Sequence, residues 1–191
     1  VLLNETIDNV ITRTDRNYID TTLGSGGHSR NLLEKLDPAA KLLAFDADQD
    51  AIECAKNTLA NFKNDIKFIN ANYSRLKFFC QLYQVYGEIS GIIFDLGVSS
   101  YQIDTAEKGF SFMHKGELDM RMDKNLKLTA YDIVNNYDFK QLTKIFYDYG
   151  EEKFSKKIAK KIIEERTENP IQTTNELRNV ILKVIKGDFA I

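Results

Sequence analysis

The sequence predicts an α/β fold: a doubly wound parallel sheet followed by an all-helical subdomain. Two observations carry this prediction. Short apolar runs alternate with helical segments in the first half of the chain, over residues 17–22, 41–46, 66–69 and 91–95. Nearly unbroken apolar runs are typical of strands that helices cover on both faces, as in a parallel sheet. From residue 129 onward, apolar residues instead recur at helical spacing.

Length and composition are those of an ordinary globular chain. Its 191 residues suit one domain, or one domain with an insertion. A formal net charge of −2 gives no global sign of nucleic-acid binding. No apolar run reaches the roughly 18 residues of a membrane span, and no signal-peptide pattern is present at residues 1–5. Cys54 and Cys80 are expected to be buried, reduced thiols, and no metal site is predicted.

Helices are predicted between the strands from apolar spacing and from stop signals. Apolar residues recur at helical intervals over residues 1–11, 30–36, 50–60 and 75–86. Asp37-Pro38 ends the second of these helices, because proline cannot continue a helix.

The second half of the chain differs in character. Residues 97–128 contain three glycines and little periodicity, and such a long irregular segment is usually functional or mobile. Helices are then predicted over residues 129–136, 138–149, 151–167 and 173–186. Thr173 to Glu176 has the pattern of a capping box. We therefore expect two domains: residues 1–128, which include the long loop 97–128, and the helical residues 129–191.

A sheet of four strands is small for this fold class, and its fourth strand would form an apolar edge. The sequence therefore predicts that C-terminal strands are missing and that the chain ends before the sheet is completed.

Ligand chemistry is expected at the carboxyl ends of the strands, where open α/β sheets bind their ligands. Three of the predicted strands end in a carboxylate, namely Asp20, Asp46 and Asp95. The first strand leads through Gly24, Gly26 and Gly27 directly into a helix. Because glycine has no Cβ, such a loop lets the backbone approach a ligand closely.

This glycine loop indicates an adenosine-type cofactor without choosing between two. A nicotinamide-dinucleotide site requires G-x-G-x-x-G, and here Gly24 and Gly26 match while Ser29 occupies the third position. Asp46 follows at the distance of an acid that accepts hydrogen bonds from ribose hydroxyls. NAD and S-adenosylmethionine both remain open from the loop alone. A simple tight turn would explain one glycine, but not three in four positions.

Three further segments decide between the two cofactors. They are residues 95–104 (DLGVSSYQID), 108–112 (KGFSF) and 118–123 (LDMRMD). With the loop pattern D-x-T-x-G-x-G-G-H-S, these segments closely resemble the bacterial 16S rRNA cytosine-N4 methyltransferases, the MraW or RsmH family. The resemblance covers essentially the whole chain. The family's Y-G-E-E-R motif corresponds to residues 149–153 (YGEEK). Small departures keep charge or apolar character: Ile103 for Leu, Lys108 and Lys153 for Arg, and Tyr101 where proline is frequent.

The resemblance implies S-adenosylmethionine-dependent methylation of the exocyclic N4 of a cytidine in the decoding region of small-subunit (16S) rRNA. It implies a Rossmann-like methyltransferase sheet with the helical subdomain inserted between its fourth and fifth strands. The implied enzyme is cytoplasmic, and its partner is 16S rRNA or the small ribosomal subunit, without a membrane. Free rRNA and an assembled subunit both stay open as substrates, as does the oligomeric state. A non-catalytic cofactor- or RNA-binding fragment and, less favoured, an NAD-linked oxidoreductase are the alternatives.

By motif match, the resemblance assigns a set of residues to the cofactor: Gly26, Gly27, His28, Asp46, Tyr73, Asp95 and Gln102. The first three would line the methionine end, Asp46 would bind the ribose hydroxyls, and Tyr73 would lie beside the adenine. His28 could instead be a helix cap or a core residue. Asp48 competes with Asp46, and Tyr73 could be a buried core side chain.

Asp95 is also the hypothesised catalytic residue. The N4 lone pair is delocalised into the cytosine ring, so this poor nucleophile gains from an acceptor for its N–H. Asp95, or backbone carbonyls near Gly97, would hold the amine, while in-line positioning supplies much of the remaining acceleration. Other amino-methyltransferases carry a D-P-P-Y-like motif here, whereas residues 95–98 have its acid without its prolines or aromatic residue.

The long loop holds further candidates. Phe110, Phe112, Met120 and Met122 either stack on a flipped base or pack the loop onto the domain. Arg121 lies between two methionines and two aspartates, which favours an internal ion pair over a phosphate contact.

One basic cluster is suited to RNA. Lys153, Lys157, Lys160 and Lys161 share one face of a predicted helix, as contacts to phosphates require. The alternative is an ordinary solvated face, because glutamates lie nearby.

Overall fold

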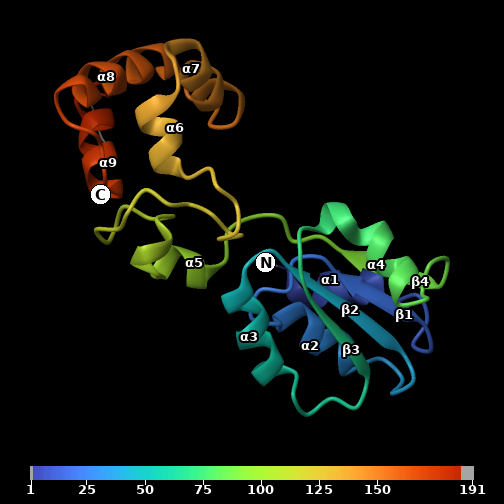
Figure 1. Cartoon of the computed structure of the whole chain (residues 1–191). Coiled ribbons are helices and arrows are strands. Elements are labelled where there is room, and N and C mark those ends of the chain that lie inside the picture. Colours follow the sequence, from blue (N-terminus) through green and yellow to red (C-terminus); the bar gives the residue numbers. More distant parts are fainter. Residues whose placement is uncertain (1, 186–191) are drawn as a thin grey trace. The chain divides into compact units, whose positions relative to one another are not determined.

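The computed structural model describes residues 2–185 of the chain (Figure 1). The chain divides into two compact units, unit 1 over Val1–Gly97 and unit 2 over Val98–Ile191. Within the described range, no helix combines the length and the apolar character needed to cross a bilayer.

Unit 1 is built on a parallel sheet. Its strands are β1 (Asn17–Asp20), β2 (Lys41–Asp46), β3 (Asp65–Asn70) and β4 (Ile89–Ile93), in the order β3-β2-β1-β4. Tyr18 of β1 lies opposite Leu42 of β2 on one side and Gly91 of β4 on the other, and every neighbouring pair is parallel. The predicted α/β fold with a parallel sheet is confirmed.

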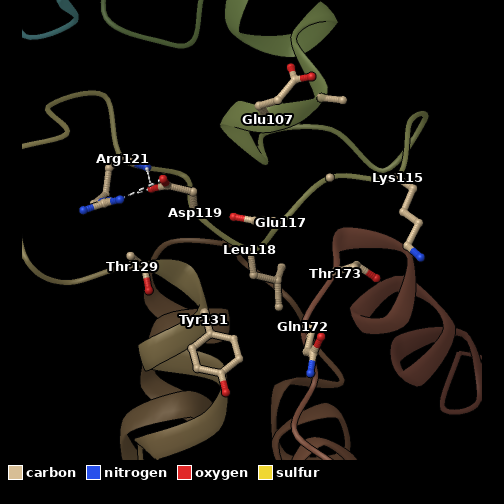
Figure 2. A pocket seen from close by; sticks show the side chains of 12 residues that line it. Glu107, Lys115, Glu117, Leu118, Asp119, Arg121, Thr129, Tyr131, Gln172 and Thr173 are labelled. Atoms are coloured by element: carbon tan, nitrogen blue, oxygen red, sulfur yellow. Dashed lines mark hydrogen bonds and ion pairs between the residues drawn. The ribbon is translucent and has the colours of Figure 1, made fainter.

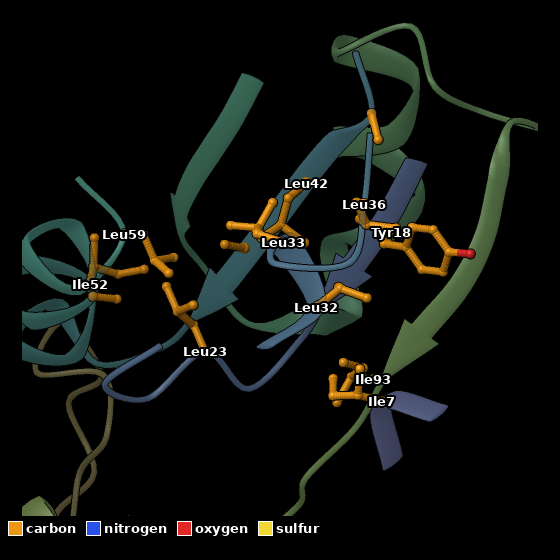
Figure 3. Packing of buried hydrophobic residues seen from close by; sticks show 13 residues of the cluster. Ile7, Tyr18, Leu23, Leu32, Leu33, Leu36, Leu42, Ile52, Leu59 and Ile93 are labelled. Atoms are coloured by element: carbon orange, nitrogen blue, oxygen red, sulfur yellow. The ribbon is translucent and has the colours of Figure 1, made fainter. Parts of the chain in front are cut away.

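Helices cover both faces of this sheet. They are α1 (Leu3–Val10), α2 (Gly27–Leu33), α3 (Gln49–Thr58) and α4 (Leu76–Leu82), with a 3₁₀ turn at Tyr73–Arg75. Leu42 belongs to a core with Leu32 of α2 and Ile52 of α3 (Figure 3), whereas Phe45 belongs to a core with Cys80 of α4. Successive side chains of a strand point to opposite faces. The doubly wound arrangement follows, with α1–α3 on one face and α4 on the other.

The two cysteines differ in burial. Cys80 is buried, as expected, but Cys54 is exposed, so its predicted burial is wrong. In α3, the buried positions are Ala51, Ile52 and Ala55, and position 54 falls outside that face of the helix.

β4 forms an edge of the sheet in the described chain, as the sequence predicts. Ile92 on this strand and Phe94 just beyond it are exposed. The expectation of further C-terminal strands stays a prediction.

Unit 2 begins with the segment that was expected to be irregular. It contains a short helix, α5 (Ser100–Asp104), and a 3₁₀ turn at Ala106–Lys108. Ser99 and Gln102 form a capping box that starts α5. The expectation is therefore wrong over these residues, because so short a helix gives no readable periodicity.

The helices that follow are α6 (Ala130–Asn136), α7 (Phe139–Asp148), α8 (Ser155–Glu168) and α9 (Thr174–Leu182). Their shared core includes Leu142 and Ile162, and the predicted capping box of Thr173 and Glu176 at the start of α9 is confirmed. Leu118 is buried in the same core, and Glu117 forms a β-bridge with Thr173. Residues 98–128 thus pack with the helices. The predicted division into a sheet domain with its long loop, residues 1–128, and a helical subdomain, residues 129–191, stays a prediction.

Candidate cofactor-binding site

Most of the predicted cofactor residues follow the carboxyl end of a strand of unit 1. Gly26, Gly27 and His28 come after β1, Asp46 ends β2, Tyr73 follows β3 and Asp95 follows β4. Because the strands are parallel, all these ends lie along one edge of the sheet. This is the edge at which open α/β sheets bind their ligands.

The loop between β1 and α2 needs its glycines for two different reasons. Gly26, the N-cap of α2, has a φ of 90°, which a residue with a side chain adopts only with strain. A Cβ on Gly26 would also lie 3.4 Å from the Cβ of Ala55 in α3, so the loop packs closely on that helix. A Cβ on Gly27 would meet nothing within 4 Å, so this position faces open space that a ligand can enter.

Asp46 connects the end of β2 to the glycine loop. One carboxylate oxygen accepts the backbone N–H of Gly24 at 2.8 Å, and the other accepts that of Asp48 at 2.9 Å. Each oxygen keeps a further lone pair, so the carboxylate can still accept hydrogen bonds from a pair of ribose hydroxyls. Burial raises the pKa of Asp46 above its usual value. Asp48 instead caps α3, accepting the N–H of Asp50 at 3.1 Å, which favours Asp46 as the ribose ligand.

Asp20 is fully buried at the end of β1. Its carboxylate accepts the Ser29 hydroxyl at 2.7 Å and the backbone N–H of Thr22 at 3.1 Å. Burial raises the pKa of Asp20, because the charged form loses its hydration there. The side chain thus holds both ends of the glycine loop.

Asp95 and His28 lie together at the end of β4. The Nδ1 atom of His28 is 3.8 Å from a carboxylate oxygen of Asp95. The side chain of Asp95 is 41% exposed, so its oxygens remain accessible to a ligand. A cavity of about 430 Å³ adjoins both residues and is also walled by Asn9 and Val10 of α1.

Tyr73 presents an open ring rather than a buried one. It is 40% exposed and makes an edge-to-face contact with Phe94, with ring centroids 5.6 Å apart. The alternative of a core tyrosine is therefore wrong, and a face of the ring is available to a planar group.

Gln102 belongs to unit 2. It is buried, and its side chain accepts the backbone N–H of Ser99 at 3.1 Å. Its assignment to the cofactor stays a prediction.

Unit 2 contains a larger cavity of about 790 Å³ (Figure 2). Its wall includes Leu118, Asp119 and Arg121, together with Tyr131 and Gln172. Arg121 donates to both oxygens of Asp119, at 2.6 and 2.9 Å. The predicted internal ion pair is confirmed, and the hydrogen bond from Arg121 holds the pKa of Asp119 below its usual value.

The apolar side chains of the long loop differ in exposure. Phe112 and Met120 are exposed, whereas Phe110 and Met122 are half-buried. The guanidinium of Arg178 lies 5.5 Å from the ring centroid of Phe112. Base stacking by these residues stays a prediction.

The predicted RNA-binding lysines differ in their interactions with neighbouring side chains. Lys161 pairs with Glu165 at 2.9 Å and with Glu164 at 3.5 Å, and Lys160 lies 3.9 Å from Glu164. Lys157 lies over the ring of Phe154, 5.5 Å from its centroid, and Lys153 precedes α8. The charge of Lys160 and Lys161 is therefore partly compensated by their own helix.

The sequence assigns no role in the site to three further residues at this sheet edge: Thr21, Thr22 and Phe94. Thr22 accepts the backbone N–H of Asp95 at 2.8 Å through its hydroxyl oxygen. The one signal that could have singled it out is its place as the threonine of D-x-T-x-G.

Comparisons with known proteins show which family this chain resembles. The family model described as MraW methylase matches residues 1–188. The ribosomal RNA small subunit methyltransferase H of Clostridium botulinum (strain Kyoto / Type A2) is 47% identical over 189 residues, which cover 99% of this chain and 60% of that protein. The protein of the same name from Clostridioides difficile (strain 630) is 45% identical over 185 residues, covering 97% and 59%.

This chain thus spans 60% or less of the length of these curated relatives. Among solved structures, an rRNA methylase from Streptococcus thermophilus aligns with 39% of this chain and 43% of its own, at 19% identity and a TM-score of 0.33. That likeness is too slight to compare sites. With its match over residues 1–188, the chain belongs to the MraW methylase family.

Proposed function

We propose that this chain binds S-adenosylmethionine at the carboxyl edge of the unit 1 sheet and serves to methylate the N4 of a cytidine in the decoding region of 16S rRNA. The observation that carries the proposal is the meeting of the glycine loop, Asp46 and Asp95 at one sheet edge, in a chain of the MraW methylase family. A cytoplasmic location goes with an rRNA substrate.

The residues at this edge fit the parts of that cofactor. Gly27 leaves open space beside the loop, Asp46 retains lone pairs for ribose hydroxyls, and Tyr73 offers an exposed ring for adenine. The cofactor would supply an electrophilic methyl group on a sulfonium. The proximity of His28 and Asp95, 3.8 Å apart, supports the assignment of the methionine end to this part of the edge.

The exposure of the Asp95 carboxylate at the sheet edge supports its role as the acceptor for the amine. Its carboxylate is partly exposed, so it can take a hydrogen bond from the N4–H and leave the nitrogen more electron-rich. The product amine loses its extra proton easily, so no strongly shifted general base is needed. Positioning of the amine in line with the methyl group supplies the rest.

Contact with rRNA phosphates is proposed for Lys153, Lys157, Lys160 and Lys161. Lys153 and Lys157 are the stronger candidates, because Lys160 and Lys161 already lie near glutamates of α8.

The proposal is tested by incubating the protein with methyl-labelled S-adenosylmethionine and either small ribosomal subunits or naked 16S rRNA. The expected product after digestion to nucleosides is labelled N4-methylcytidine. Label at carbon 5 or on the ribose would contradict the N4 assignment. Cofactor binding without any transfer would favour the non-catalytic alternative for this chain.

A further inference from the structure

We propose that Thr22 is a positioning residue, which fixes Asp95 against the glycine loop through a chain of hydrogen bonds anchored on Asp20. The inference rests on the proposed function of Asp95 as the acceptor for the amine. It assigns a role to a side chain outside the predicted cofactor set.

The chain of hydrogen bonds runs through four residues. Ser29, in the first turn of α2, donates its hydroxyl to Asp20 at 2.7 Å. The second oxygen of Asp20 accepts the backbone N–H of Thr22 at 3.1 Å. The hydroxyl oxygen of Thr22 in turn accepts the backbone N–H of Asp95 at 2.8 Å. The start of α2 is thereby connected to the end of β4.

Burial makes Asp20, the anchor of these hydrogen bonds, rigid. Asp20 and Ser29 are fully buried, so water does not compete for their hydrogen bond. Thr22 is half-buried, and its β-branched side chain has few rotamers to choose from. Its hydroxyl is therefore held in one place by a fixed backbone.

Asp95 needs such a support because it lies beyond the sheet. The last residue of β4 that pairs with β1 is Ile93, opposite Asp20. Asp95 follows two residues later, outside the strand, with a partly exposed side chain. A displacement of about 1 Å in a group that positions a reacting atom can cost on the order of a hundredfold in rate. Thr22 supplies the fixed point that the strand no longer gives.

The neighbouring threonine offers a matched control. Thr21 is buried and donates its hydroxyl to the carbonyl of Ile93 at 2.7 Å. The backbone N–H of Thr21 donates to the same carbonyl at 3.0 Å, so this carbonyl stays paired when the hydroxyl is removed. Thr21→Val therefore removes a buried hydroxyl at the same sheet edge without touching Asp95.

The test compares Thr22→Val, Thr22→Ser and Thr21→Val with the unmodified protein. We expect Thr22→Val to lower kcat for methyl transfer by about tenfold or more, with the KM for S-adenosylmethionine changed by less than about threefold. Thr22→Ser keeps the acceptor oxygen and is expected to restore most of kcat. Thr21→Val is expected to melt at a lower temperature but to keep kcat. Equal kcat in Thr22→Val and the unmodified protein, or equal losses in Thr22→Val and Thr21→Val, would overturn the inference.

A second readout does not depend on catalysis. Hydrogen exchange of the Asp95 backbone amide, followed by NMR, is expected to accelerate about tenfold or more in Thr22→Val and to stay unchanged in Thr21→Val. If the unmodified protein transfers no methyl group, the proposed function fails, and this exchange still decides whether Thr22 holds Asp95. Unchanged exchange in Thr22→Val would overturn the positioning role.

Discussion

Asp20 holds the glycine loop through hydrogen bonds, but the burial of its charged carboxylate lowers the stability of the fold. It is fully buried with two donors, Ser29 and the backbone of Thr22, and burial raises its pKa. A carboxyl group with a raised folded-state pKa favours folding most when it is protonated. That stability is complete below the ordinary carboxyl pKa and is lost as pH rises through the raised value.

Asp20→Asn should remove this pH dependence, because the amide carries no charge to bury. We expect the free energy of unfolding of the variant to decline less than that of the unmodified protein between about pH 4 and pH 8. Urea unfolding monitored by circular dichroism at a series of pH values measures the difference. The same decline in both proteins would contradict a buried, titrating Asp20.

Gly26 is required by the backbone conformation, whereas Gly27 leaves space for a ligand. Gly26→Ala places a Cβ on a residue with a φ of 90° and is expected to cost about 1–2 kcal/mol of folding stability. Gly27→Ala meets no neighbouring atom, so it should leave the melting temperature unchanged or slightly raised while weakening the binding of S-adenosylmethionine. Thermal unfolding and calorimetric titration of both variants test this. Loss of stability in Gly27→Ala would show that the space beside it is not open.

Among the helices and strands, the sequence predicts best those features that depend on residues close together in the chain. β2 covers Lys41–Asp46, as the apolar run over these residues predicts. The predicted capping box of Thr173 and Glu176 is also present. The pairing of Arg121 with Asp119 was also predictable, because the two residues are neighbours on the chain. The exposure of Cys54 was not, since it depends on which side of α3 meets the sheet.

Contacts between segments far apart in the sequence could not be predicted from the spacing of apolar residues or from motifs. Thr22 and Asp95 are 73 residues apart, and nothing in either motif states that a hydroxyl of one accepts the N–H of the other. The edge-to-face pair of Tyr73 and Phe94 likewise joins residues that follow β3 and β4, the two outer strands of the described sheet. Motifs therefore supply the candidate residues, whereas the hydrogen bonds and ring contacts between them depend on the fold.

The α9 cap gives a prediction for one element. The Thr173 hydroxyl accepts the N–H of Glu176 at 3.3 Å, and the Glu176 carboxylate accepts the N–H of Thr173 at 3.3 Å. Thr173→Ala should cost about 1 kcal/mol, which lowers the melting temperature of a chain of this size by about 2–4 °C. Thr173→Ser keeps the hydroxyl and should melt close to the unmodified protein. Equal melting of all three proteins would mean that the cap contributes nothing.

For the whole molecule, a formal net charge of −2 means that any RNA affinity must come from local groups. Among the candidate lysines, those that form no ion pair with a glutamate of the described residues should contribute most to phosphate binding. The measure of such contacts is the dependence of affinity on salt, because each phosphate contact releases counterions.

Lys153→Ala and Lys157→Ala should each weaken binding to an oligonucleotide of the 16S decoding region and reduce the slope of log K against log salt by about 0.7–0.9. Lys161→Ala, whose charge is shared with Glu164 and Glu165, should change the slope less. Fluorescence anisotropy at several salt concentrations measures all three. An equal or larger change for Lys161→Ala would contradict the ranking.

Calorimetric titration with S-adenosylmethionine tests the proposed cofactor site most directly. Asp46→Asn removes the carboxylate that faces the glycine loop, whereas Asp65→Asn changes an exposed aspartate at the opposite end of the neighbouring strand. We expect the unmodified protein and Asp65→Asn to bind the cofactor equally, Asp46→Asn to bind at least about tenfold more weakly, and NAD not to bind. Equal affinity of all three proteins, or binding of NAD in place of S-adenosylmethionine, would contradict a methyl-donor site at this edge of the sheet.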